Sequence, residues 1–198
     1  SVLVVNPAFP AQSPKELIAY TQANPGKLDF ASSGNGSAQH LAAELFALKT
    51  GAKMTHVAYR GGGPAMVDVM AGNVPVFFAS LASSLPFIQS GKLRALAVAG
   101  AQRSPVLPDT ATFSEVGMSG VDAYEWNGLF VPAGTPAAIV ETISKDVSAA
   151  LDDREVKARL MALGAEVIGS SPKELEQFRR AEISRWTALG KRANISLD

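Results

Sequence analysis

Two glycine-rich stretches carry the groups best suited to chemistry in this sequence. The first is SSGNGSAQH, residues 32–40, and the second is YRGGGP, residues 59–64. Each follows an apolar run and precedes a helical pattern, so each is expected to join the end of a strand to the start of a helix. Helix starts expose unpaired N–H groups and carry a partial positive charge, which suits them to anions. The first hypothesis is therefore an anion site at these two turns.

The first stretch is rich in hydrogen-bond donors. Ser37 is expected to cap the following helix, and Ser32 and Ser33 add hydroxyls before it. A dinucleotide-binding turn reads G-x-G-x-x-G, but Gln39 occupies the third glycine position, and no G-x-x-x-x-G-K-[ST] loop occurs. A carboxylate is therefore a better candidate ligand than a nucleotide phosphate. The alternative is that the glycines and serines only form a tight turn.

The second stretch has three consecutive glycines, residues 61–63, whose main-chain N–H groups no side chain covers. Pro64 suits the first position of a helix. Arg60 either supplies a full positive charge to an anion or is a solvated loop residue. Tyr59 either contacts a ligand or is a half-buried residue at a strand end. In a parallel sheet both turns lie at the carboxyl ends of strands, where ligands of open α/β sheets bind.

Other candidate groups are few. Ser80 follows a predicted strand, and either donates to a ligand or caps the next helix. His40 lies in a first helical turn, where positive charge is disfavoured, so a neutral hydrogen-bonding role is expected; His56 lies within a strand. Two histidines without cysteine or HExxH spacing predict no metal site, and there is no G-x-S-x-G elbow. We expect no cofactor and no catalysis, with an α/β enzyme acting on a small organic acid as the alternative.

Composition excludes several classes of protein. The 18 basic residues balance the 18 acidic ones without a basic cluster, so no nucleic-acid partner is expected. No apolar run is long enough for a transmembrane helix, and the lack of cysteine excludes disulfides. The chain starts at SVLVVNP without a charged segment or a cleavage site, so we expect no signal peptide within it.

The order of the elements predicts an α/β fold with a parallel sheet. Strands are expected at residues 1–6, 28–31, 54–59, 74–80 and 93–98, with helices between them. Residues 101–122 are expected to form a surface excursion with a small helix near 112–117. From Thr135 onward the pattern is helical apart from a weak strand at 166–168, so large apolar faces lack a sheet to cover them. A domain that uses these faces for interaction, without a small ligand, is a second alternative.

Six stretches, in order along almost the whole chain, resemble the Bug-type extracytoplasmic solute receptors of tripartite tricarboxylate transporters. They are VLVVNP (2–7), KLDFASSGNGSAQHLAAELF (27–46), HVAYRGGGPAMVDVMAGNV (56–74), GKLRALAVAG (91–100), WNGLFVPAGTP (126–136) and LGAEVIGSSPKELEQF (163–178). The resemblance implies a two-lobed, Venus-flytrap fold of the type II periplasmic-binding-protein class. It implies capture of a small carboxylate, either a di- or tricarboxylate or an aromatic acid, and its delivery in the periplasm to membrane permease subunits. Carried over by position, the ligand-binding residues are Ser32, Ser33, Gly36, Ser37 and His40 in the first turn and Tyr59, Arg60, Gly61 and Gly62 in the second.

The resemblance also implies that part of one lobe is absent. Family members carry about a hundred further residues before the position of Ser1, enough for part of a lobe. Residues 7–125 are expected to form a near-complete lobe two, and residues 1–6 and 126–198 the crossover strands and C-terminal helices of an incomplete lobe one. We therefore expect exposed apolar surface on those helices, which a second copy of the chain would cover. Many members have aspartate at Ala79, so an amino-acid ligand is less expected here than a plain or aromatic carboxylate.

Overall fold

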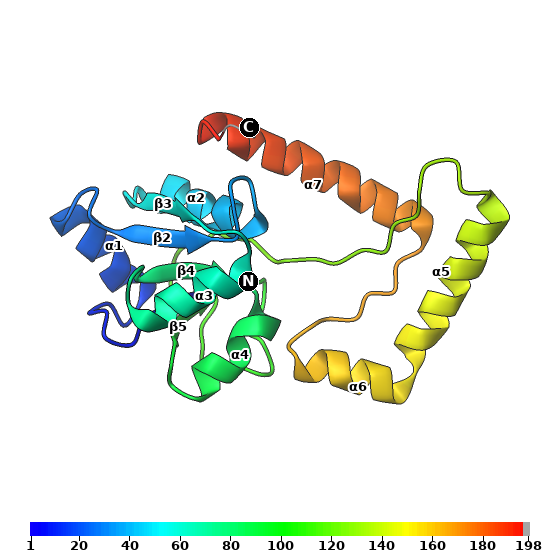
Figure 1. The fold of residues 1–198 in the computed structure, drawn as a ribbon, viewed down its shortest axis with the longest axis horizontal. Helices are drawn as coiled ribbons and strands as arrows, with labels where there is room; N and C mark the ends of the chain where they lie inside the picture. Colours follow the sequence, from blue (N-terminus) through cyan, green and yellow to red (C-terminus); the bar gives the residue numbers. More distant parts are fainter. Residues whose placement is uncertain (196–198) are drawn as a thin grey trace. The chain divides into compact units, whose positions relative to one another are not determined.

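The computed structural model describes residues 1–195 (Figure 1). They divide into two compact units. The first unit comprises Ser1–Glu125 and the end of the chain from Ala188, and the second comprises Trp126–Thr187. Every strand found among the described residues belongs to the first unit, whereas the second unit is made of helices and irregular segments.

A five-stranded sheet with the order β3-β2-β4-β1-β5 forms the first unit. The strands are β1 (Val2–Val5), β2 (Asp29–Ser32), β3 (Thr55–Ala58), β4 (Val76–Ala79) and β5 (Arg94–Val98). β2 runs parallel to β3 and β4, whereas β1 pairs antiparallel with β4 and β5. The prediction of a parallel sheet is therefore wrong at β1. An apolar run indicates that a strand is buried, but it does not indicate the direction of that strand.

The position of β1 also bears on the division of the chain. Residues 1–6 were expected to belong with the C-terminal helices, but β1 lies inside the sheet of the first unit and is buried at all four positions. At the other end, residues from Ala188 cluster with the first unit, where Leu189 is buried. The compact units thus differ from the expected boundaries at both ends of the chain.

Four helices connect the strands: α1 (Pro14–Ala23), α2 (Ala38–Thr50), α3 (Gly62–Ala71) and α4 (Leu81–Gln89). The ends of α1 and α2 follow the capping signals in the sequence. The Ser13 hydroxyl accepts the Glu16 N–H at the start of α1, and Gly51 ends α2 in the left-handed conformation. Ser13 thus marks the start of α1, and Gly51 marks the end of α2.

Aromatic side chains fill the core beneath α2. Phe78 of β4 is fully buried, and its ring lies 5.7 Å from that of Phe46 and 6.1 Å from that of Phe113. Phe113 belongs to the segment 101–122, which forms turns instead of the helix predicted near 112–117. Pairing of Thr112 with Val98 and burial of Phe113 hold this segment against the sheet.

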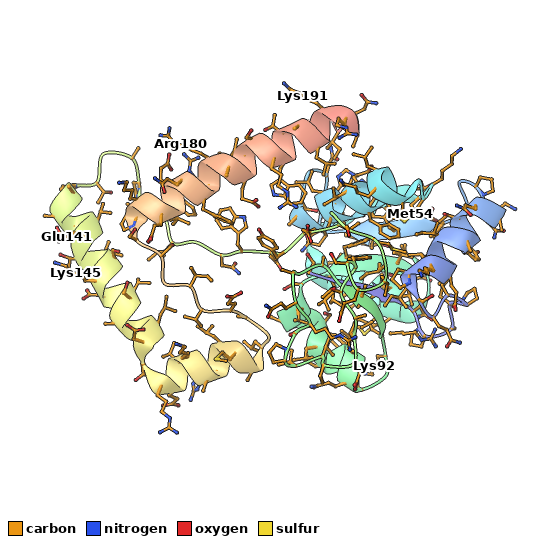
Figure 2. All side chains as sticks on the ribbon, turned by 180° about the vertical axis from the view of Figure 1, so that it is seen from behind. Met54, Lys92, Glu141, Lys145, Arg180 and Lys191 are labelled. Carbon is orange, nitrogen blue, oxygen red and sulfur yellow. The ribbon has the colours of Figure 1, made fainter. Side chains whose placement is uncertain are left out.

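The second unit exposes much of its apolar surface. Its helices are α5 (Ala137–Asp152), α6 (Arg154–Ala162) and most of α7 (Pro172–Arg192), and neither α5 nor α6 buries a residue. Ile139, Met161 and Ile168 are 49%, 52% and 72% exposed, which confirms the expected exposed apolar surface. Residues 166–168 form no strand, because this unit offers them no neighbouring strand among the described residues. On the polar face of α5, Glu141 and Lys145 form an ion pair of 2.9 Å (Figure 2).

Candidate functional site

The carboxyl ends of β3, β2 and β4 lie side by side at one edge of the sheet. Ser32 ends β2, Tyr59 follows β3 and Ser80 follows β4. The two glycine-rich turns are joined directly, because the Gly61 N–H donates to the Ser33 carbonyl at 3.2 Å and the Tyr59 N–H to the Ser32 carbonyl at 3.0 Å. The structure therefore brings together the residues that were predicted from two separate stretches of sequence.

Several donors of the first turn are used within the turn itself. The Ser37 hydroxyl accepts the His40 N–H at 3.3 Å, as predicted for the cap of α2. The Gly36 N–H donates to Nδ1 of His40 at 3.1 Å, and the Ser33 hydroxyl donates to Oε1 of Gln39 at 2.6 Å. Gly36 and Ser33 thus each have a partner within the turn.

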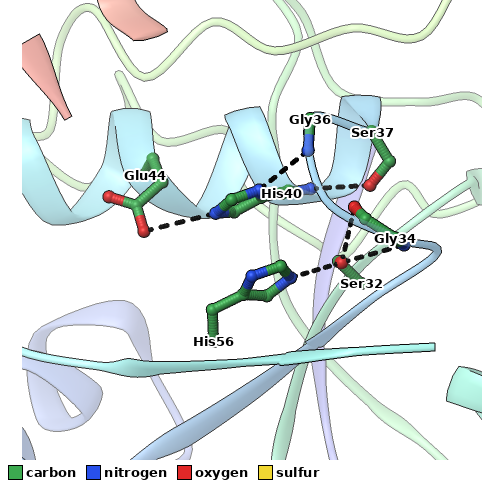
Figure 3. A network of polar contacts seen from close by, with 7 residues as sticks. All are labelled: Ser32, Gly34, Gly36, Ser37, His40, Glu44 and His56. Carbon is green, nitrogen blue, oxygen red and sulfur yellow. Dashed lines mark hydrogen bonds and ion pairs between the residues drawn. The ribbon is translucent and has the colours of Figure 1, made fainter. Parts of the chain in front are cut away.

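A stacked pair of histidines lies behind the first turn (Figure 3). The rings of His40 and His56 are 3.7 Å apart and inclined by 15°. His40 is 5% exposed, and its Nε2 atom lies 3.7 Å from a carboxylate oxygen of Glu44. Nε2 of His56 lies 2.5 Å from the hydroxyl of Ser32. Burial, together with the neighbouring His40, lowers the pKa of His56.

His56 is a residue that the sequence gave little reason to select. Its position within a strand carried no motif, and only its register beside Phe30 places it behind the first turn. The rings of these two residues stack at 5.0 Å, so Phe30 covers part of the imidazole. A signal existed in the spacing of the two predicted strands, but it becomes informative only once their parallel register is known.

The contact between Ser32 and His56 resembles a nucleophile with its base. Ser32, however, is completely buried, and its hydroxyl also accepts the Gly34 N–H at 3.1 Å. The nearby carboxylate of Glu44 faces His40 rather than His56. A substrate would not reach this hydroxyl, and the contact therefore holds the turn in shape.

In the second turn, the side chain of Tyr59 is bound to α3. Its hydroxyl donates to a carboxylate oxygen of Asp68 at 2.6 Å, and the Asn73 amide donates to the other oxygen at 3.1 Å. Burial, with the bond to Asp68, raises the pKa of Tyr59 to about 12. The bonds from Tyr59 and Asn73 lower the pKa of Asp68. The Tyr59 hydroxyl is thus engaged and positions the strand end, whereas Arg60 is exposed and forms no ion pair within the described part of the chain.

The glycines of the second turn differ from one another. Gly61 has a φ of +113° and precedes α3, which begins at Gly62. Pro64 is therefore the third helical residue rather than the first, because the unusual conformation of Gly61 lets the helix begin earlier. A Cβ atom at Gly62 or Gly63 would meet nothing within 4 Å, and N–H groups of a first helical turn have no partner within their helix. A ligand can therefore approach this helix start without meeting a side chain at either glycine.

Ser80 occupies the cap position of α4, but its hydroxyl makes no capping bond. Its carbonyl instead accepts the hydroxyls of Ser83 and Ser84 at 3.1 and 2.8 Å.

Within residues 1–195, no group of three His, Cys, Asp or Glu side chains could hold a metal ion. No helix in the same range is long and apolar enough to cross a membrane.

Comparison with known proteins identifies the family. The model of the tripartite tricarboxylate transporter family receptor, TctC, matches residues 1–195. The chain belongs to this family. One relative is BugT of Bordetella pertussis, which is 35% identical to this chain. The match covers 99% of this chain and 60% of BugT. The chain spans 56% of the length of a related Pseudomonas protein and 60% of that of BugT.

Solved structures share the fold of this TctC-family chain. A Rhodopseudomonas palustris protein with adipate is 35% identical with a TM-score of 0.93, over 98% of this chain and 65% of that one. MatC from the same species, with bound malate, is 33% identical with a TM-score of 0.89, over 95% of this chain and 65% of that one. The α/β periplasmic-binding-protein fold and the family expected from the sequence are therefore confirmed.

Proposed function

We propose that this chain is the carboxylate-binding part of an extracytoplasmic receptor of a tripartite tricarboxylate transporter, with the ligand at the turns after β2 and β3. The observation that carries the proposal is the bond between Gly61 and Ser33, which places two helix starts side by side. Helix starts favour anions, because their N–H groups and dipoles point at the ligand. Related structures with adipate and malate support a carboxylate as the ligand.

The predicted site residues divide into two proposed roles. Direct contact is assigned to groups that remain open at the turns: the Gly62 N–H, the guanidinium of Arg60, and the hydroxyls of Ser37 and Ser80. A second group holds these donors in place through bonds already present: Ser32, Ser33, Gly36, His40, Tyr59 and Gly61. Because the ligand would be held largely by backbone and hydroxyl donors, small acids of different lengths would fit one design.

The same turns disfavour a ligand with an amino group. The acidic residues there, Glu44 and Asp68, already face His40 and Tyr59. Ala79, at the end of β4, offers only a buried methyl group. An ammonium group would therefore lose water without gaining an acceptor, which costs free energy. The ligand class proposed is a plain di- or tricarboxylate, or an aromatic acid.

The proposed role is binding and delivery rather than catalysis. The burial of Ser32 and the orientation of Glu44 towards His40 support this role, because neither group is placed to act on a ligand. A transporter receptor hands its ligand to membrane permease subunits, and we place this one in the periplasm, where the related BugD is a binding protein. A second copy of the chain is the proposed cover for the exposed residues of α5 to α7, such as Ile139 and Ile183.

A thermal-shift screen tests the proposed function. The panel contains adipate, malate, citrate and benzoate, with glutamate and glycerol as controls that add an amino group or remove the charge. At a ligand concentration about 100 times Kd, binding adds about 2.7 kcal/mol. For a chain of this size the melting temperature would rise by roughly 5–10 °C. A shift with the plain acids supports the proposal, and the absence of any carboxylate-dependent shift overturns it for this chain.

A further inference from the structure

The protonation state of His40 follows from its hydrogen bonds. The Gly36 N–H donates to Nδ1 of His40, so that nitrogen must carry a lone pair and no proton. A neutral imidazole has one proton, which in His40 must then be on Nε2, the atom that faces Glu44 at 3.7 Å. A doubly protonated His40 would place an N–H against the Gly36 N–H. This turn geometry therefore requires a neutral ring.

The neighbouring ring reinforces that requirement. His56 stacks on His40 at 3.7 Å, so a proton on one ring disfavours a proton on the other. The charged or titratable groups recorded at the pair are Glu44 of α2 and the two rings, whereas β2 contributes the uncharged Phe30 and Ser32. Through Ser32, the pair is also connected to the Gly34 N–H. Both sides of the glycine turn thus depend on two adjacent imidazoles.

We propose that the stacked His40–His56 pair is a positioning device for the carboxylate-binding turn, which is held in shape only while the pair is neutral. With the proton of His40 on Nε2, the pair binds the Gly36 N–H and the Ser32 hydroxyl. Protonation of His40 breaks the first bond and frees the Gly36 N–H, while Gly34 stays bonded to Ser32 and Ser37. The part of this inference that predicts ligand affinity rests on the proposed function. The shape of the turn can be measured without any ligand.

Nuclear magnetic resonance of the ¹⁵N-labelled chain provides the first test, and it needs no variant. At about pH 7.5 the long-range ¹H–¹⁵N spectrum should show His40 with its proton on Nε2. On acidification to about pH 5.5, within the range in which histidine side chains take up a proton, the amide signals of Gly34 and Gly36 should move together with the ring signals. A proton on Nδ1 at neutral pH, or glycine amides that do not follow the rings, would overturn the proposal.

Two variants separate positioning from simple packing. In His40→Asn, the amide oxygen replaces Nδ1 as acceptor but does not titrate, so the Gly36 amide should stay bonded at both pH values. In His40→Leu, which fills similar space without an acceptor, the Gly36 amide should be unbonded at both. Identical pH responses of the Gly36 amide in His40→Asn and the wild type would refute the role of His40.

Adipate serves as the probe for affinity. Protonation of adipate itself weakens binding to both proteins near the lower pH, so the wild type should lose several-fold more affinity than His40→Asn between about pH 7.5 and about pH 5.5. Equal loss in the two proteins would contradict the positioning role. If no acid binds at any pH, the proposed function fails for this chain, and the tautomer and amide signals still decide whether the pair positions the turn.

Discussion

The main-chain N–H of Gly61 donates to the carbonyl of Ser33 at 3.2 Å. This bond joins the turn after β3 to the turn after β2. The parallel register of Ser32 with Ala58 brings the two turns next to each other. The bond also consumes one of the N–H groups expected to meet an anion. The second turn therefore has a supporting glycine, Gly61, and two glycines at the start of α3, Gly62 and Gly63, beside which a Cβ atom would meet no atom within 4 Å other than those of chain neighbours.

Gly61 and Gly62 should respond differently to the same substitution. Gly61 has φ +113° and ψ 164°, a region that is essentially restricted to glycine and costs other residues about 1–3 kcal/mol. Gly61→Ala should therefore lower the free energy of unfolding by about that amount. Gly62→Ala, the matched control, adds a methyl group to open space at the first helical residue, so the free energy of unfolding should change by less than about 0.5 kcal/mol. Urea unfolding compares the two, and equal effects would contradict the assigned conformations.

Gly62 separates ligand binding from folding. A side chain there meets no atom of the protein within 4 Å, so Gly62→Val should fold with little change in stability. Its branched side chain would occupy the space through which a carboxylate approaches the N–H. Affinity for any acid that binds the wild type should fall at least about tenfold, or 1.4 kcal/mol, in a titration by calorimetry. Unchanged affinity in a folded variant would remove Gly62 from the site.

Turn and capping chemistry explains what could be predicted from the sequence. Ser13, Ser37 and Gly51 act locally, so their roles in helix ends were evident from a few neighbouring residues. The strand-to-helix turns were found for the same reason. In contrast, the direction of β1 depends on strands far along the chain, and an apolar run carries no information about direction.

The internal partners of the site residues were also beyond the sequence. The pairing of Tyr59 with Asp68 requires the exact start of α3, and that start depends on the positive φ of Gly61. The stacking of His40 on His56 requires the register between β2 and β3. Because both depend on tertiary geometry, composition and spacing could identify the turns but not which of their donors remain open.

Tyr59 should be the last of the three tyrosines to ionise. Burial, with the bond to Asp68, raises its pKa to about 12, so an alkaline titration followed by phenolate absorbance should contain a late step. That step should disappear in Tyr59→Phe and move to lower pH in Asp68→Asn, without reaching the ordinary value, because burial remains. The neutral phenol is favoured in the folded state, so stability should decrease as pH rises from about 10 towards 12. A titration of Tyr59→Phe that matches the wild type would contradict this assignment.

The exposed apolar residues of the second unit should drive self-association. Ile139 and Ile168 are 49% and 72% exposed, and large exposed apolar surfaces mark sites of interaction. The average mass in sedimentation equilibrium should therefore rise with protein concentration. The double variant Ile139→Ser/Ile168→Ser should reduce the rise, while its stability stays within about 0.5 kcal/mol because both residues are on the surface. A constant monomeric mass at all concentrations would contradict the proposed second copy.

His56 should make the folded state sensitive to acid. Burial, with the neighbouring His40, lowers its pKa in the folded state, while in the unfolded chain it stays near its usual value of about 6.5. The unfolded chain then binds more protons as pH falls, so stability is fully present above about pH 6.5 and is lost as pH decreases towards the lowered pKa. His56→Gln keeps a polar atom facing Ser32 but does not titrate, so its melting temperature should depend less on pH between about 7.5 and 5.5 than that of the wild type. Because both proteins share every carboxylate, any acid sensitivity common to them comes from other groups, and only the difference reports on His56. If the melting temperatures of the two proteins changed equally with pH over this range, protonation of His56 would not destabilise the folded state, and the prediction would be wrong.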